Sequence, residues 1–427
     1  MNKEVLAAIA IFVLGFGLIS RRLERSIVTP PMAYVGCGLL ISSSFLGLIQ
    51  EVKITNEVIQ VLAEITLAVL LFTDASRIQL KLLRQEYNLP LRLLGIGLPI
   101  TIILGTILAL LLFPNELNIW SAAALATILS PTDAALGQAV VNSSEVPAFI
   151  RHGINIESGL NDGICLPILL LFISLSVKGE QSSNATYWLT FTGQQIFVGV
   201  LVGIAVGYFG SKLIAQSLKR KWMTQSFEDL SVLGLSILSY TCAEIIGGNG
   251  FIAAFCAGLT LGFISTKSVL SSLREFGEAE GQLLTLISFL LYGAVMVVPS
   301  VNDATWQMWI YGIASLTITR IIGVAIATSN LKLQLDSTLF VGWFGPRGIA
   351  SLIYGLLILE KENLPGKELI FTTMVITVLM SVFAHGLTAF PGVSWYANRI
   401  SNKKHLHSSM PEMKPVKEMP VRLPWKE

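Results

Sequence analysis

Ser130-Pro131-Thr132-Asp133 interrupts an otherwise apolar stretch, residues 118–141, and this interruption decides how the chain folds. Proline removes a backbone donor and clashes with the preceding helical turn, so a helix across this stretch breaks in its middle. A helix break at membrane depth is tolerated where it lines a cavity, and its freed carbonyls and helix ends can hold ions. The simpler alternative is a proline kink whose Thr132 and Asp133 cap the second half-helix.

The composition around this stretch is that of a membrane protein. The chain has 427 residues, of which 53% are hydrophobic and 13% charged, against about 25% charged in soluble domains. Its mean hydropathy is +0.69, and its charges cluster between apolar runs of roughly 20 residues, the length that crosses a bilayer. The cysteine spacings match no metal or disulfide motif, and the net charge of +2 suggests no nucleic-acid partner. We therefore expect a membrane protein that is not an enzyme and has no cofactor.

Turn residues and charges divide the chain into about thirteen candidate membrane spans, which predicts an all-α integral membrane protein. The spans lie near residues 4–20, 31–50, 56–75, 89–113, 118–141, 147–174, 185–215, 226–246, 250–265, 279–299, 305–328, 336–359 and 368–390.

The distribution of lysine and arginine predicts an N-terminus outside and a C-terminus in the cytoplasm. In this orientation 22 of the 29 basic residues fall on the cytoplasmic side and five fall outside, which is the positive-inside pattern. The remaining two, Arg320 and Arg347, fall within spans. We expect insertion in the cell (inner) membrane and a disordered cytoplasmic tail over residues 393–427, which is short, polar and rich in proline.

A second interruption, Gly345-Pro346-Arg347-Gly348, breaks the span at 336–359. The two broken spans are seven apart, so they correspond if the first six and the last six spans are repeats that are inverted in the membrane. Broken helices at equivalent positions of two inverted halves indicate the binding site of a transporter. The repeat is not visible residue by residue, and two unrelated kinks are the alternative.

Ionisable residues inside spans cost roughly 2.5–3.5 kcal/mol each on insertion scales, so each of them needs a partner or a task. The ionisable residues inside the predicted spans are Glu64, Asp74, Asp133, Glu157, Asp162, Glu244, Arg320 and Arg347. We expect Arg320 to pair with a carboxylate or a helix C-terminus, and the roles of Glu64 and Glu244 stay open.

Two of these acids lie on the predicted span 147–174, close to one another. Glu157 and Asp162 are little more than one helical turn apart, and two carboxylates in a medium of low dielectric constant repel each other unless one is neutralised. We expect Arg347 to neutralise Glu157 in a structural ion pair. Asp162 then has no structural partner, which favours a functional role for this acid.

Taken together, four motifs of the chain resemble those of NhaP-type sodium/proton antiporters, a family that includes the eukaryotic sodium/proton exchangers. The motifs, which span nearly all of the membrane region, are Leu71-Phe72-Thr73-Asp74-Ala75, Ser130-Pro131-Thr132-Asp133, Glu157-Ser158-Gly159-Leu160-Asn161-Asp162-Gly163 and Gly345-Pro346-Arg347-Gly348.

The resemblance implies a homodimer of thirteen-helix subunits, each with two inverted six-helix repeats. Residues 1–88 and 225–300 would form the dimer interface, residues 89–175 and 301–392 the mobile core with its broken helices, and residues 176–224 the linking helix.

The resemblance also implies roles for individual residues. Asp162 would bind either the cation or the proton, and Thr132, Ser158 and Asp74 would complete or border the site of the transported Na⁺. Because related families often have glutamate at the position of Asp74, whether this shorter side chain binds the cation directly or through water stays open. The supporting residues would be Asn161, Asp133, Glu157, Arg347 and Arg320.

We expect this site to exchange Na⁺, or Li⁺, for H⁺ across the membrane, because carboxylate, hydroxyl and carbonyl oxygens suit hard cations. Competition between cation and proton for Asp162 would couple the two flows, and a rigid-body movement of the core would expose the site alternately. One free acid predicts an electroneutral exchange of one proton per cation. A K⁺/H⁺ antiporter of the same fold is the main alternative; a cation channel and a membrane receptor or scaffold are alternatives from other classes.

Overall fold

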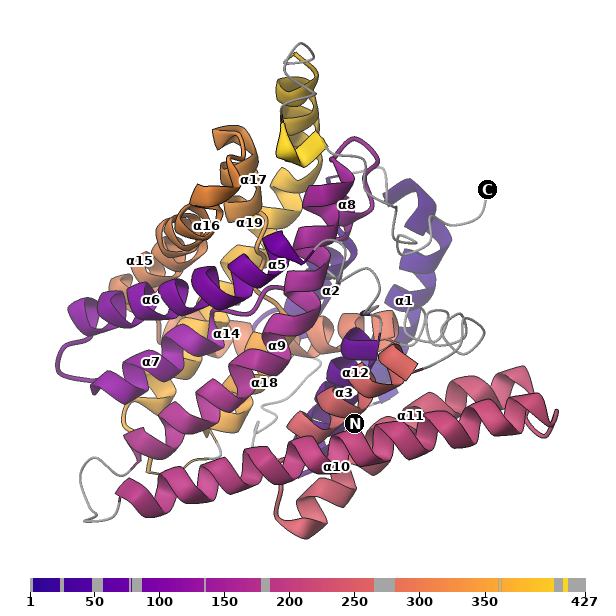
Figure 1. Ribbon diagram of the computed structural model, residues 1–427. Helices are drawn as coiled ribbons and strands as arrows, with labels where there is room; N and C mark the ends of the chain where they lie inside the picture. The colour runs from indigo at the N-terminus through magenta and orange to yellow at the C-terminus, as the bar shows by residue number, and fades with distance from the viewer. Residues whose placement is uncertain are drawn as a thin grey trace.

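The structure is a computed structural model that describes residues 3–23, 27–47, 57–76, 78, 87–133, 136–177, 185–264, 281–359, 361, 363–402 and 410–413. Within these ranges all regular secondary structure is helical, so the predicted all-α class is confirmed (Figure 1). Six helices are both long and apolar enough to cross a membrane by length and composition, and shorter apolar helices accompany them.

Each of the thirteen predicted spans lies on a helix or on an interrupted pair of helices. The uninterrupted helices are α1 (Lys3–Leu23), α2 (Pro30–Ile41), α3 (Glu57–Ser76), α9 (Ala148–Ser176), α10 (Ala185–Lys219), α11 (Gln225–Ile246), α12 (Gly250–Ile264) and α19 (Lys367–Ser401). Three further spans each contain a π-helical turn. In the first, the turn joins α5 (Asn88–Arg92) to α6 (Leu98–Leu112); in the second, it precedes α14 (Val297–Asn302); in the third, it joins α15 (Trp306–Ala314) to α16 (Arg320–Thr328). The two interrupted pairs are α7 (Ile119–Ile128) with α8 (Gln138–Val141), and α17 (Leu335–Trp343) with α18 (Ile349–Leu359).

The last helix is longer than the sequence suggested. We expected the tail to begin at residue 393, but α19 continues to Ser401. Its additional turns bury Val393 and Tyr396, and the Tyr396 ring stacks on Phe340 with the ring centroids 4.2 Å apart. The prediction of a disordered tail over residues 393–427 is therefore wrong for its first nine residues, because polar neighbours hid an apolar face at helical spacing.

A second part of the predicted tail also has a defined position. Residues Pro411–Met413 form a single helical turn, and the buried Glu412 carboxylate accepts hydrogen bonds from the Gln334 amide at 3.1 Å and the Ser337 hydroxyl at 2.7 Å. These donors lie at the start of α17, where helix amides have no partner within the helix. Residues 403–409 and 414–427 of the predicted tail lie outside the described residues.

The helices pack in two groups that meet at α9. In the first group α7 lies between α6 and α9. In the same group α16 packs against α17, and both α15 and α18 pack against α19. In the second, α12 packs against α3, α10 and α11, and the long helices α10 and α11 run along one side of the molecule (Figure 1). Both broken pairs belong to the first group, and α3 brings its last turn to α9 from the second.

Two glycines of α12 allow an unusually close approach to α3. A Cβ added at Gly258 would collide with the Phe72 carbonyl, and one added at Gly262 would collide with the Ser76 carbonyl. Helices within membranes associate through such small residues because backbone contact replaces the hydrophobic effect. This contact fixes the end of α3, which carries Asp74.

We predict that Gly258→Ala lowers the stability of the protein by about 1–3 kcal/mol, because the added methyl group forces two backbones apart. The measurement is thermal melting of the purified protein in detergent. The matched control is Gly234→Ala on α11, where no atom lies within 4 Å of an added Cβ. The control should melt at or slightly above the wild-type temperature, because alanine favours helix by up to about 1 kcal/mol. Equal melting of both variants would contradict the close packing of α3 and α12.

Candidate functional site

The two helix breaks meet, and each supplies a charged side chain to the other. The Arg347 guanidinium donates through Nη1 to the carbonyls of Ser130 and Pro131, the latter at 3.1 Å, at the end of α7. In return, Asp133 Oδ2 accepts a hydrogen bond of 3.1 Å from the amide of Ile349, the first residue of α18. A cation thus lies at a helix C-terminus and an anion at a helix N-terminus, the arrangement that the helix dipole favours.

Backbone and hydroxyl contacts join the same two segments. The Asp133 amide donates to the Pro346 carbonyl at 2.7 Å, and the Ser351 hydroxyl donates to the Ile128 carbonyl at 2.8 Å. A Cβ added at Gly348 would overlap the Asp133 carboxylate, so this position needs a glycine. The two breaks therefore form one structural unit, and their equivalence as parts of two inverted repeats stays a prediction.

Glu157 forms its ion pair with Arg320. The guanidinium of Arg320 binds both carboxylate oxygens, with distances of 2.5 Å from Nη1 to Oε1 and 2.7 Å from Nη2 to Oε2, and each residue is 1% exposed. The expected pair between Glu157 and Arg347 is therefore wrong. Arg347 is engaged with the carbonyls of the first break, and α16 brings Arg320 to Glu157 instead.

The structure brings the hydroxyl and amide groups of the predicted cation site together. Thr132 Oγ1, at the first break, lies 2.8 Å from Ser158 Oγ on α9. Asn161 Nδ2, one turn further along α9, donates to the same Thr132 oxygen at 2.7 Å. All three residues are at least 97% buried. Thr132 is thus held against α9 by two hydrogen bonds, and we call these three residues the polar cluster.

Asp162 lies next to the polar cluster with one carboxylate oxygen unengaged. Its Oδ1 is buried and has no hydrogen-bond partner among the described residues, and the same holds for the side-chain oxygen of Asn161. Asp74 and Asp133 lie close enough to interact electrostatically with Asp162. An unengaged acceptor beside further carboxylates attracts cations, whether a metal ion or a proton.

Asp74 reaches this region from α3. Its backbone packs against α9, because a Cβ added at Gly159 would lie 3.7 Å from the Asp74 carbonyl oxygen. Gly159 is three residues before Asp162, so the last turn of α3 borders the same part of α9. The predicted site residues therefore come from two helices and the first break, and they gather around one part of α9: Asp74 from α3, Thr132 from the break, and Ser158, Asn161 and Asp162 from α9 itself.

The two acids that the sequence left open have structural partners outside this site. Glu64 on α3 accepts a hydrogen bond of 3.0 Å from the Tyr240 hydroxyl on α11. Glu244, near the end of α11, accepts one of 2.7 Å from the amide of Gly250, the first residue of α12. Both carboxylates join neighbouring helices, and Glu244 caps a helix N-terminus.

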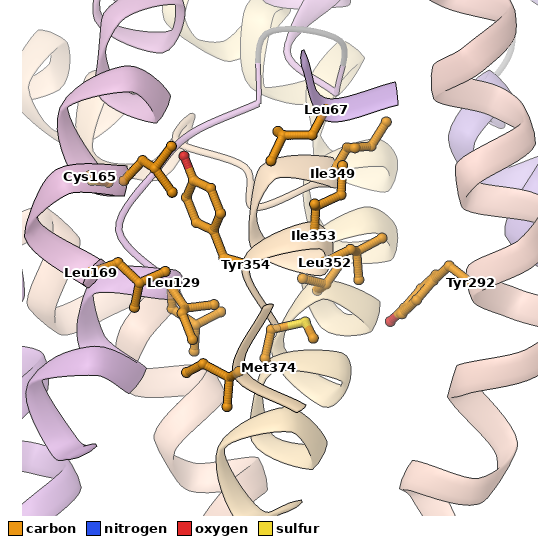
Figure 2. Packing of buried hydrophobic residues seen from close by; sticks show 14 of the residues in the cluster. Leu67, Leu129, Cys165, Leu169, Tyr292, Ile349, Leu352, Ile353, Tyr354 and Met374 are labelled. Atoms are coloured by element: carbon orange, nitrogen blue, oxygen red, sulfur yellow. The ribbon is translucent and has the colours of Figure 1, made fainter. Parts of the chain in front are cut away.

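Sequence reasoning missed Tyr354, which lies in an apolar run of α18. The buried Tyr354 hydroxyl donates a hydrogen bond of 2.6 Å to the backbone carbonyl of Asp162. Figure 2 shows its ring extending from α18 toward Cys165 on α9. Tyr354 therefore ties the second broken helix to the turn that carries the free carboxylate.

A helical membrane protein with two opposed helix breaks and a free carboxylate beside them has the architecture of an ion-coupled secondary transporter. The model of the transmembrane sodium/hydrogen exchanger family matches residues 7–395. The chain belongs to the sodium/hydrogen exchanger family.

Individual relatives agree with this assignment. A probable Na⁺/H⁺ antiporter of Schizosaccharomyces pombe is 26% identical over 259 residues, which are 58% of this chain and 34% of the relative. The Na⁺/H⁺ antiporter NhaS2 of Synechocystis is 26% identical over 355 residues, which are 79% of this chain and 61% of the relative. The K⁺/H⁺ antiporter NhaP2 of Shewanella is 22% identical over 329 residues, which are 76% of this chain and 55% of the relative. The chain thus spans between one third and less than two thirds of these three relatives.

A solved structure has the same fold. The sodium proton antiporter MjNhaP1 from Methanocaldococcus jannaschii superposes with a TM-score of 0.73 over 93% of this chain and 99% of that chain, at 20% sequence identity. The expected NhaP-type fold is therefore confirmed.

We predict that Glu157→Ala lowers stability by roughly 3–5 kcal/mol, because it leaves the Arg320 guanidinium buried without its partner. Adding Arg320→Met should restore most of the loss, as measured by thermal melting. The control adds Arg347→Met to Glu157→Ala, which should melt lower still because the first break loses its cap. Recovery with Arg347→Met, and none with Arg320→Met, would contradict the observed pairing.

Proposed function

We propose that this protein is a secondary active antiporter that exchanges Na⁺, or Li⁺, for H⁺ across a membrane. The observation that carries the proposal is the buried Asp162 Oδ1, which has no hydrogen-bond partner among the described residues. The hydroxyl groups of Thr132 and Ser158 belong to the neighbouring polar cluster. Such a set of oxygen atoms suits a hard monovalent cation, and the names of the relatives from S. pombe and Synechocystis agree with Na⁺.

In this mechanism cation and proton compete for one carboxylate. A proton on Asp162 removes the charge that attracts the cation, and a bound cation displaces the proton, so both ions cannot occupy the site together. Thr132 and Ser158 border the cation, Asn161 fixes Thr132, and Asp74 contributes a further carboxylate, directly or through water. Rigid-body movement of the core then exposes the occupied site on alternate sides of the membrane.

The remaining charged residues hold this arrangement in place without exchanging ions. Arg347 and Asp133 keep the breaks together, and the ion pair of Glu157 and Arg320 joins α9 to α16. With Glu157 neutralised and an amide at Asn161, one titrating acid is left at the centre. We infer an electroneutral exchange of one proton per cation, which a titrating Asp74 would change.

The assembly and orientation are part of the same proposal. Two copies would associate through residues 1–88 and 225–300, while residues 89–175 and 301–392 move as the core on either side of the linking helix. The N-terminus would lie outside the cell (inner) membrane and the C-terminus in the cytoplasm, as the excess of basic residues on that side supports.

We predict that Asp162→Asn abolishes cation-dependent proton movement, because the amide keeps the shape of the side chain and cannot take up either ion in exchange for the other. Purified protein is reconstituted in proteoliposomes with a pH-sensitive dye inside, and a Na⁺ gradient is applied. The matched control is Asp303→Asn, an exposed aspartate after α14, which should exchange at the wild-type rate. Exchange that persists in Asp162→Asn would remove this residue from the centre of the mechanism.

We predict that the exchange rate does not depend on membrane potential, because equal charges move in opposite directions. The same proteoliposomes are clamped at zero and at a negative potential with K⁺ and valinomycin, and dye responses to Na⁺ are compared. Turnover that follows the potential would contradict the stoichiometry and implicate Asp74 as a second titrating acid.

Exchange of K⁺ for H⁺ is the second candidate, and the similarity to NhaP2 of Shewanella favours it. Hydroxyl and carboxylate oxygens do not by themselves fix the radius of the ion. Parallel titrations with Na⁺, Li⁺ and K⁺ compare the three half-saturating concentrations directly. In these titrations the membrane potential is held by a method that uses neither K⁺ nor a protonophore. Half-saturation by K⁺ at a lower concentration than by Na⁺ would replace the first candidate with the second.

A further inference from the structure

His385 lies inside α19, beside the second helix break, and is 1% exposed. Its Nε2 is 2.9 Å from the carbonyl oxygen of Trp343, the last residue of α17. Its Nδ1 is 3.2 Å from the Ser381 hydroxyl and 2.9 Å from the Ser381 carbonyl. The predicted span 368–390 would end shortly after His385, but α19 continues to Ser401, so His385 lies well inside the helix.

The contact with Trp343 answers a need that the break creates. Where α17 stops, its last carbonyls have no amide partner further along the helix. The Gly345 amide reaches the Trp343 carbonyl at 2.8 Å, and the His385 imidazole is the second donor. At the first break, the Arg347 guanidinium serves the carbonyls at the end of α7 in the same way. At the end of each of the two broken helices, α7 and α17, a side chain thus donates a hydrogen bond to the last carbonyls.

The ring also connects to the first break through Ser381. The Ser381 hydroxyl oxygen accepts a hydrogen bond of 2.6 Å from the Arg347 amide. Because a carbonyl only accepts, the contact with Trp343 requires a proton on Nε2. Nδ1 faces the two oxygens of Ser381: without a proton it accepts from the hydroxyl at 3.2 Å, and with a proton it donates to the carbonyl at 2.9 Å. In either state the ring binds Trp343 through Nε2 and Ser381 through Nδ1, and the Ser381 hydroxyl oxygen accepts from the Arg347 amide.

We propose that His385 is a positioning residue for ion exchange. It fixes the end of α17 and, through Ser381, the backbone of Arg347, so that the Arg347 guanidinium stays on the carbonyls of Ser130 and Pro131. Thr132 follows Pro131 directly, and its hydroxyl belongs to the polar cluster beside Asp162. His385 thereby sets the geometry of the cation site without touching the ion. This role rests on the proposed antiport function.

A neighbouring contact provides a matched control. The indole nitrogen of Trp343 donates to the Thr388 hydroxyl at 2.9 Å, three residues beyond His385 on the same helix. Thr388→Val removes a hydrogen bond to the ring of Trp343 and leaves its carbonyl untouched. Any effect that comes merely from loosening Trp343 against α19 should appear in this variant as well.

The experiment compares His385→Leu, His385→Gln and Thr388→Val with the wild type in proteoliposomes, over a range of Na⁺ concentrations and pH values. We expect His385→Leu to raise the KM for Na⁺ about five-fold, the factor that corresponds to one hydrogen bond of ordinary strength, with a smaller effect on the maximal rate. Glutamine retains an amide donor for the Trp343 carbonyl, so His385→Gln should stay within about two-fold of wild type. Thr388→Val should keep the wild-type KM. Thermal melting in detergent shows whether each variant is folded.

Three results would overturn the proposal. A wild-type KM in a folded His385→Leu protein would show that the contact does not reach the cation site. An equal rise of KM in Thr388→Val would reduce the role of His385 to packing. A pH profile of His385→Gln that lacks one titration step of the wild type would make His385 a proton carrier. If the proposed antiport function itself were wrong, the wild type would show no exchange. Cation binding to the wild type and the variants would then be compared by the rise in melting temperature that the cation causes.

Discussion

A helix that ends at membrane depth leaves backbone carbonyls and amides without partners, and the rest of this structure depends on how two such helices supply one another. Arg347, on the second break, serves the carbonyls at the end of α7, and Asp133, on the first break, serves the amides at the start of α18. Neither break could exist alone without a buried unsatisfied group, which costs several kcal/mol in hydrocarbon. The exchange of caps therefore holds the two breaks together beside the polar cluster.

This use of charge decides which acids remain available. Because Arg347 is engaged with backbone carbonyls, Glu157 takes Arg320 as its partner, and both charges are neutralised in a bidentate pair. The Asn161 side-chain amide donates its hydrogen bond to the Thr132 hydroxyl oxygen. Asp162 is left with a buried oxygen that none of the described residues engages, while the Tyr354 hydroxyl holds its backbone. One acid without a permanent partner is what competition between a cation and a proton requires.

Sequence reasoning predicted those features that depend on local chemistry. The apolar runs predicted the helices, and a proline inside two of these runs predicted the breaks. The closeness of Glu157 and Asp162 on one helix predicted that one acid is neutralised and the other is not. Features that depend on how distant helices pack were beyond it. The choice of Arg320 over Arg347 follows from the position of α16 against α9, and Tyr354 carries no charge in an apolar run. The apolar face that extends α19 to Ser401 was hidden among polar residues and a proline.

The proposed antiport requires that Asp162 gives up a proton when it takes a cation. Isothermal titration of Na⁺ into the purified wild-type protein, in two buffers of different ionisation enthalpy, counts the protons released on binding. We expect release that approaches about one proton per bound Na⁺ as the pH is lowered, because the carboxylate must lose its proton for the ion to bind. Binding of Na⁺ with the same heat in both buffers at every pH, and hence without proton release, would contradict it.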